Sequence, residues 1–261
     1  MIKVNDNEVI KWAAGSQPIN RAYNHDNLIF PEFSGTTPVV LPAGFVFNFN
    51  ARDYNPATRT IPAENGALEA NAFILGADPV AVSADSLTID SYNNHSMVAL
   101  ISTGKDGLYS LNGTDNEAAT WIFKFGAYGS EHAPHFLSNR TMRNYNWMVR
   151  TYTYVDEMHV CLHDSTNHCD LSLNGTYPVI AAITVEPGNG AVTMRNITEG
   201  VTVQPFNFDY GRSNATPVFF AGYSNYASSP EWYQGMFYWC FYANRCLTDA
   251  EVTQVIDYNE N

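Results

Sequence analysis

Short apolar stretches separated by polar turns recur along most of this chain. Residues 45–50 (Phe-Val-Phe-Asn-Phe-Asn) alternate between apolar and polar positions, which is typical of a strand with one buried face. Many such strands at short spacing favour a sandwich or jelly roll. The strands predicted in the main part of the chain are 45–50, 72–75, 87–89, 97–101, 121–125, 147–152, 157–162, 179–183, 191–194, 218–222 and 236–242.

One helix is predicted, close to the C-terminus. Thr248 and Glu251 have the spacing of a capping box, in which each side chain satisfies a backbone amide of the first turn. Val252, Val255 and Ile256 follow on one face of that helix. The pattern therefore predicts an all-β domain with one C-terminal helix.

The first 33 residues, 1–33, predict a small N-terminal β-meander. Its strand-like segments are short and joined by tight turns, and they are 2–4, 8–12, 19–23 and 28–30. A unit this small buries too little apolar surface to be stable alone. We expect it either to anchor the chain on a partner or to add a capping sheet to the main domain.

Residues 34–44 predict a linker because they include Pro38, Pro42 and Gly44. Residues 45–261 then form the main domain, long enough for one large β fold. Aromatic residues make up 14% of the chain and charged residues 15%, a composition that favours strands over helices.

The chain is acidic, with 13 Lys and Arg against 26 Asp and Glu and a net charge of −13. Such a surface repels polyanions, so we expect no nucleic acid and no anionic membrane as a partner. The sequence has no signal-peptide pattern and no apolar run of transmembrane length. We expect synthesis and assembly in a host cytoplasm, without export by a signal peptide.

The last third of the chain carries a recognisable motif. An apolar strand is followed by Asn-Arg-Cys-Leu-Thr at 244–248 and then by Glu251. This order resembles the concanavalin A-like lectin/glucanase superfamily, in its laminin-G-like branch. The resemblance is closest over 179–256, although residues 196–200 replace the family's compact Asn-Gly turn. It implies a concanavalin A-like jelly-roll β-sandwich.

Two N-terminal stretches resemble proteins of a different group. Residues 9–30 resemble short β modules in virion proteins of crAss-like phages, which infect gut Bacteroidales, and residues 47–62 resemble sandwich domains of the same virions. The resemblance implies a virion protein: a head fibre, a capsid-decoration protein or a tail-associated protein. Residues 1–33 would then bind other virion proteins, and a homotrimer is expected by analogy with fibres.

A loop rich in aromatic and amide side chains is the candidate carbohydrate-binding site. Tyr and Trp rings suit a recognition surface, and Asn can bind sugar hydroxyls. The candidate residues are Tyr223, Asn225, Tyr226, Trp232 and Tyr233. The alternative is that Trp232 and Tyr233 cover the sandwich edge. Trp121, Trp147 and Trp239 lie within strand patterns and are expected in the core.

A histidine and cysteine cluster is the candidate metal site. The candidate Zn²⁺ ligands are His159, Cys161, His163, His168 and Cys169. The first three alternate along one predicted strand, and a turn would bring the other two alongside. Their spacing matches no standard zinc motif. A Cys161–Cys169 disulfide is an alternative, and we favour a plain hairpin with free thiols.

No catalytic arrangement is predicted. Glycanases of the superfamily carry Glu-x-Asp-x-x-Glu on one strand, with two carboxylates about 5 Å apart. The nearest acidic pair here, Asp156 and Glu157, occupies adjacent positions that face opposite sides of a strand. We therefore expect no catalytic cofactor. The resemblance also implies a Ca²⁺ loop, as in some superfamily members; the sequence does not place it, and Asp106 and Asp115 are candidate residues.

These observations favour a non-catalytic virion protein whose sandwich domain presents a binding surface, with a bacterial surface glycan as the candidate ligand. The first alternative is a free carbohydrate-binding lectin without a virion role. The second alternative, a glycoside hydrolase, is less favoured because the paired carboxylates are missing.

Overall fold

The computed structural model divides the chain into two compact units, Met1–Val40 and Leu41–Asn261. The boundary falls inside the segment predicted as a linker, and Pro42 is already buried in the second unit. The residues described are 2–4, 7–9, 22–24, 27–28, 39–64, 71–90, 93, 96–100, 118–127, 135–138, 147–152, 157–162, 168–172, 177–187, 191–207, 218–220, 223–224, 231–232 and 234–261.

The described part of the first unit is an antiparallel sheet of four short strands in the order β1-β2-β3-β4. The strands are β1 (Ile2–Val4), β2 (Asn7–Val9), β3 (Ala22–Asn24) and β4 (Asn27–Leu28). Because sequential strands are neighbours, this sheet is the predicted β-meander.

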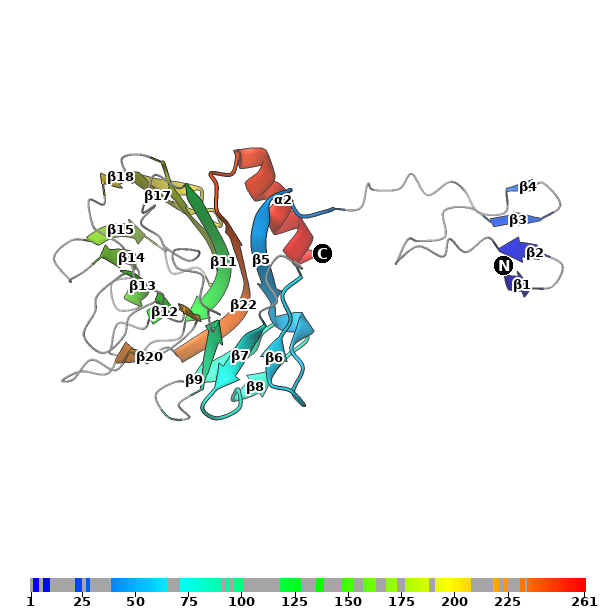
Figure 1. The fold of residues 1–261 in the computed structure, drawn as a ribbon, viewed down its shortest axis with the longest axis horizontal. Helices are drawn as coiled ribbons and strands as arrows, with labels where there is room; N and C mark the ends of the chain where they lie inside the picture. Colours follow the sequence, from blue (N-terminus) through cyan, green and yellow to red (C-terminus); the bar gives the residue numbers. More distant parts are fainter. Residues whose placement is uncertain are drawn as a thin grey trace. The chain divides into compact units, whose positions relative to one another are not determined.

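The second unit contains two sheets that, within the described residues, have eight strands each (Figure 1). All of their described pairings are antiparallel. The front sheet has the order β15 (His168–Ser172), β14 (Glu157–Leu162), β13 (Trp147–Tyr152), β12 (His135–Ser138), β19 (Val218–Phe220), β10 (Met97–Leu100), β7 (Ala72–Leu75) and β6 (Thr60–Ile61). The back sheet has the order β18 (Val201–Asn207), β17 (Ala191–Asn196), β16 (Val179–Val185), β11 (Ala119–Ala127), β22 (Gln234–Ala243), β9 (Leu87–Asp90) and β8 (Ala81–Val82), and β5 (Phe45–Asn50) also pairs with β22.

The main core lies between the two sheets. Phe47, Phe49 and Trp121 of the back sheet are fully buried and belong to the same cluster as Ile74 and Val98 of the front sheet. Their rings pack at centroid distances of 4.8 Å between the two phenylalanines and 5.7 Å between Phe47 and Trp121. Face-to-face packing of two antiparallel sheets confirms the predicted β-sandwich.

A second core lies on the outer face of the back sheet, beneath helix α2 (Asp249–Glu260). Val252 and Val255 of the helix pack with Phe241 and Trp239 of β22, and Figure 1 shows α2 beside β22 and β5. The predicted capping box is present at the helix start. In the described part of the chain, no helix is long and apolar enough to span a bilayer.

A β-bulge decides which residues of β22 face this second core. Lys124 pairs with Trp239 and Phe125 with Phe237, so Tyr238 is the extra residue. The bulge shifts the alternation by one position. As a result Tyr238 and Trp239, although adjacent in sequence, both belong to the outer cluster. The prediction of a buried Trp239 is confirmed, at 2% exposure.

Several strands were not predicted, and the reason is clearest for β18. This strand contains Pro205, which cannot donate to a ladder. β18 lies at the edge of the back sheet, and its register with β17 shifts between Val192 and Met194. The pairs Val192–Phe206 and Met194–Val203 leave Pro205 inside the irregularity. Because β18 is an edge strand with a bulge, it can contain Pro205. In the sequence alone, this proline argued against a strand.

Candidate binding surface

The segment with the predicted carbohydrate-binding residues contains a short hairpin. β20 (Tyr223–Ser224) pairs antiparallel with β21 (Glu231–Trp232), so Tyr223 lies opposite Trp232 and Ser224 opposite Glu231. Directly opposed positions of an antiparallel pair share one face. The fold thus brings two of the five predicted positions together, next to strand β12 of the front sheet. The other three, Asn225, Tyr226 and Tyr233, lie outside the described residues.

The β14–β15 ladder carries four of the five predicted zinc ligands. Cys161 pairs with His168, and Val160 pairs with Cys169. Positions alternate between faces along a strand, so His159, Cys161 and His168 occupy one face and Cys169 the other. His163 lies outside the described residues, as do Asp106 and Asp115. The zinc site, the calcium loop and the Cys161–Cys169 disulfide therefore stay predictions.

Where the structure describes side chains, no three His, Cys, Asp or Glu residues form a group that could hold a metal ion. The two cysteines described there are both reduced, Cys240 in the core and Cys246 at the start of the C-terminal segment. Burial raises the pKa of both thiols, so neither is activated as a nucleophile.

A buried polar network at the end of α2 was not predicted. Asn259 and Asn48 exchange two side-chain hydrogen bonds, of 3.0 and 3.1 Å, and Asn50 also donates to Asn259 Oδ1 at 3.1 Å. All three amides are at most 6% exposed. The sequence signal was the polar half of 45–50, because Phe47 and Phe49 face the main core while the two asparagines face the helix.

The network also includes the half-buried carboxyl of Glu64. Asn48 Nδ2 donates to Glu64 Oε2 at 2.5 Å, and Arg52 Nη2 lies 4.0 Å from Glu64 Oε1. Burial raises the pKa of Glu64, and the charge of Asp53 raises it further. A raised carboxyl pKa is a property of general acids. Here the carboxyl is a hydrogen-bond acceptor between β5 and the helix end, so we assign it a structural role.

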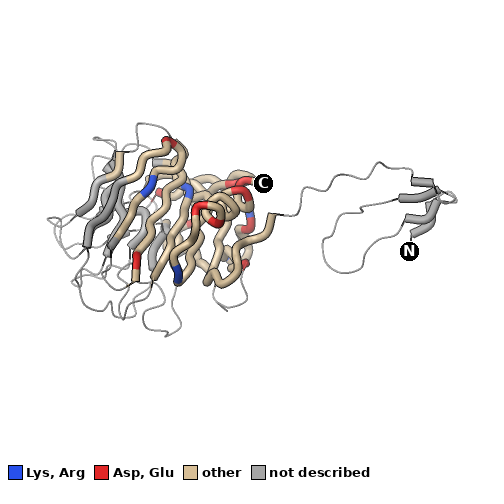
Figure 2. The backbone as a smooth tube through the Cα atoms, turned by 90° about the horizontal axis from the view of Figure 1, so that it is seen from above, with Lys and Arg blue, Asp and Glu red and all other residues tan. Residues whose placement is uncertain are grey.

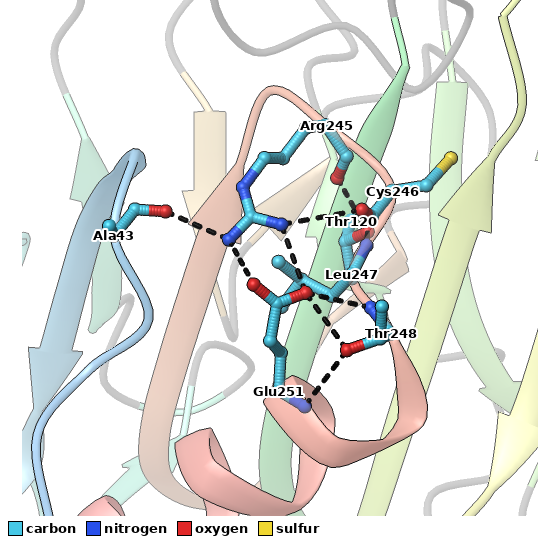
Figure 3. A network of polar contacts seen from close by, with 7 residues as sticks. All are labelled: Ala43, Thr120, Arg245, Cys246, Leu247, Thr248 and Glu251. Carbon is cyan, nitrogen blue, oxygen red and sulfur yellow. Dashed lines mark hydrogen bonds and ion pairs between the residues drawn. The ribbon is translucent and has the colours of Figure 1, made fainter.

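The motif that carries the family resemblance forms a second polar network at the start of α2 (Figure 3). Arg245 donates through both terminal nitrogens to the two oxygens of Glu251, at 2.6 and 3.0 Å, and also to the carbonyl of Ala43 at 2.8 Å. Glu251 in turn accepts from the amide and hydroxyl of Thr248. The hydroxyl of buried Thr120 donates to the Arg245 carbonyl and accepts from the Leu247 amide. These contacts connect the start of α2 to β11 and to the first residues of the sandwich unit.

Neither a family model nor a curated protein matches this sequence. Among solved structures, the fold is similar to the binding domain of botulinum neurotoxin serotype C1, with a TM-score of 0.58, 7% identity and coverage of 84% of this chain and 52% of that one. It is also similar to the binding domain of botulinum neurotoxin DC in complex with SialylT (TM-score 0.55, 10% identity, 83% and 52% coverage). A third similar structure is Trypanosoma rangeli sialidase in complex with sialic acid (TM-score 0.56, 9% identity, 83% and 33% coverage).

This chain therefore spans about half the length of the neurotoxin binding domains and a third of the sialidase. At these identities the likeness concerns the fold. The predicted all-β sandwich with one C-terminal helix is confirmed.

Proposed function

We propose that the sandwich unit, residues 41–261, is a non-catalytic carbohydrate-binding domain, and that the β20–β21 hairpin carries its binding site. The observation that supports the site is the cross-strand pair of Tyr223 and Trp232. Two aromatic positions that share one face of a short hairpin would provide a platform on which a sugar ring can stack. Asn225 and Tyr226 follow β20 directly in the sequence and would add hydroxyl-binding groups.

The fold supports a carbohydrate ligand by analogy. Two structures with a similar sandwich were solved with SialylT and with sialic acid. Folds of this kind carry many functions, so the analogy supports the class of ligand and leaves its identity to experiment.

We propose a binding role rather than catalysis because the sequence lacks the paired carboxylates of superfamily glycanases. Asp156 and Glu157 are adjacent, and Glu157 is the first residue of β14. The raised-pKa carboxyl of Glu64 is tied to Asn48 at the end of α2. None of these three acids lies in residues 223–233.

Glycan-array binding with the full chain and with Trp232→Ala tests the proposal. We expect the wild-type protein to bind a defined set of glycans and the variant to lose at least about fivefold in affinity, since stacking on a tryptophan contributes more than about 1 kcal/mol. Val82→Ala, on an exposed strand, is the control and should bind normally. Unchanged binding by Trp232→Ala would exclude the hairpin, and release of reducing sugar would exclude a purely binding role.

A second proposal concerns the particle on which the protein is anchored. The compact unit Met1–Val40 supports a role as an anchor, and the resemblance to phage proteins suggests a virion as the particle that is decorated. We expect a chain that begins at Leu41 to be a monomer in light scattering and the full chain to form an oligomer or to associate with particles. If the full chain and the chain that begins at Leu41 are both monomers and neither associates with particles, a free lectin is favoured instead.

A further inference from the structure

The back sheet ends at β8, an edge strand whose apolar side chains are exposed. In the described part of the sheet, β8 pairs with β9 and lies last in the strand order (Figure 1). Val82 lies opposite Leu87, which is fully buried in the main core, so the two positions share the inner face of the sheet. Val82 is nevertheless 55% exposed, and Val80, just before the strand, is 54% exposed. The apolar inner face therefore continues beyond the part that the fold covers.

The segment around β8 carries no charge. Residues 79–84 read Pro-Val-Ala-Val-Ser-Ala, and the nearest acids are Asp78 and Asp85. Natural edge strands are usually protected from pairing by charged side chains, above all lysine. The chain as a whole has a net charge of −13, and acidic positions lie along α2 (Figure 2). Two copies of such a chain repel each other, and the repulsion is weakest where both surfaces are uncharged.

A second copy of the chain, related by a two-fold axis, is complementary to this edge. A two-fold interface brings the same surface of both copies together, and two edge strands then pair antiparallel. With the axis at Ala81, this residue lies opposite itself, and Val80 of each copy lies opposite Val82 of the other. Directly opposed side chains of an antiparallel pair contact each other. The pairing would therefore cover all four exposed valines.

The charges at the two ends of the segment also match in this arrangement. Asp85 of each copy would lie opposite Ala77 of the other. Ala77 lies between Gly76 and Asp78, and Arg59 contacts both: it donates to the Gly76 carbonyl at 2.6 Å and lies 2.8 Å from the Asp78 carboxylate. The guanidinium at one end of the segment would thus face the acid that comes from the other end of the second copy.

From these observations we propose that β8 is a self-association edge, at which two copies of this chain join their back sheets into one continuous antiparallel sheet. The contact is small, because β8 contains two residues and stable interfaces bury a much larger area. It therefore acts between copies that are already held close together, and does not keep free sandwich units as dimers. The inference is independent of the proposed glycan site.

Oxidative trapping of the full chain with single introduced cysteines tests the register. Ala81 and Ala84 are both exposed in the same segment. Two copies of Ala81 would be within reach of a disulfide, whereas Ala84 would lie opposite Asp78, which leaves its two copies about 20 Å apart. We expect Ala81→Cys to form a covalent dimer, seen on a non-reducing gel, at least about tenfold faster than Ala84→Cys. The wild-type chain, with its four cysteines, gives the background.

A charge placed on the edge should prevent the trapping. In the Ala81→Cys background, Val82→Asp should slow dimer formation at least about tenfold, because a carboxylate would then face an apolar position of the second copy. Thr202→Asp is the control, since it changes the net charge equally from an exposed position on β18, the edge strand at the other end of the same sheet. Val82→Ala keeps the edge uncharged and should still allow the dimer.

The outcomes decide between pairing at β8 and chance collision. Equal trapping of Ala81→Cys and Ala84→Cys, or no trapping above background in either, would overturn the proposed pairing. Equal slowing by Val82→Asp and Thr202→Asp would assign the effect to net charge and overturn the role of β8. Glycan binding by the hairpin is measured separately, so the failure of one proposal is distinguishable from the failure of the other.

Discussion

The two ends of helix α2 are attached to the sandwich by opposite kinds of polar contact. At the start, the charged pair of Arg245 and Glu251 lies at the surface, with side chains 34% and 26% exposed. At the end, the uncharged amides of Asn48, Asn50 and Asn259 are almost completely buried. Both networks connect the helix to the first residues of the sandwich unit, through Ala43 and through β5.

The carboxylates at these two ends have opposite pKa shifts. Hydrogen bonds from Arg245, together with those from Thr248, lower the pKa of Glu251 to about 2. Burial raises the pKa of Glu64. The donors of Glu251 stabilise its anion, whereas at Glu64 the effect of burial outweighs the hydrogen bonds from Asn48 and Tyr258 and favours the proton. Both networks attach the helix to the sandwich, but the one at its start stabilises a charged carboxylate and the one at its end favours an uncharged carboxyl.

The largest effect is expected from breaking the buried end. Asn259→Ala removes the partner of two buried amides, Asn48 and Asn50, and each unsatisfied group costs about 1–3 kcal/mol. We expect the free energy of unfolding to fall by about 2–4 kcal/mol in urea denaturation. Asn261→Ala is the control, because this exposed amide bonds only the Asp257 carbonyl among the contacts described. Equal effects of the two variants would contradict the assignment.

A smaller loss is expected at the exposed end. Glu251→Ala removes the capping box and the partner of Arg245, and helix caps contribute about 1–2 kcal/mol. Exposure and salt screening limit the contribution of the ion pair. We expect a loss of about 1–2 kcal/mol at neutral pH, measured as before. Asp257→Ala, an exposed acid on the same helix, should be close to wild type. A loss greater than that of Asn259→Ala would reverse the comparison.

The pH dependence should have opposite signs at the two ends. Because Glu251 has a folded-state pKa below its ordinary 4.5, its contribution is present above pH 4.5 and is lost as pH falls toward 2. Because Glu64 has a raised pKa, its contribution is present below pH 4.5 and is lost as pH rises through the folded-state value. Thermal unfolding should be measured at several pH values. We expect Glu251→Gln to lack the loss of stability that the wild-type protein shows as pH falls from 4.5 toward 2.

Glu64→Gln should act in the other direction. The amide oxygen can still accept from Asn48, and the buried charge is gone, so the variant should be more stable than wild type at pH 7 and equal to it near pH 4. A variant less stable than wild type at pH 7 would mean that Glu64 is needed as an anion.

The smallest effect is expected for the pair of Arg195 and Asp249. The Asp249 side chain is 92% exposed, and exposed ion pairs contribute about 0–1 kcal/mol. Asp249→Asn should change the free energy of unfolding by less than about 0.5 kcal/mol. A larger loss of unfolding free energy would show that the pair of Arg195 and Asp249 contributes to attaching the start of α2 to the sandwich.

The sequence alone predicted a large part of this fold. Alternation over 45–50 and the spacing of Thr248 and Glu251 are local patterns, and both β5 and the capped helix lie where those patterns place them. The candidate site was less predictable. Tyr223 and Trp232 were chosen for residue type, and only the hairpin register shows that they are directly opposed.

Contacts between residues distant in sequence were decided by the tertiary structure, because local sequence patterns do not specify them. The bulge at Tyr238 depends on pairing with β11, and it places two neighbouring aromatic residues on one face. The bond between Asn48 and Asn259 joins positions 211 residues apart, and the same Asn48 amide also donates to Glu64. Periodicity reports which residues prefer a buried face. Which residues meet across that face depends on the register between strands distant in sequence, and so does the pKa that results.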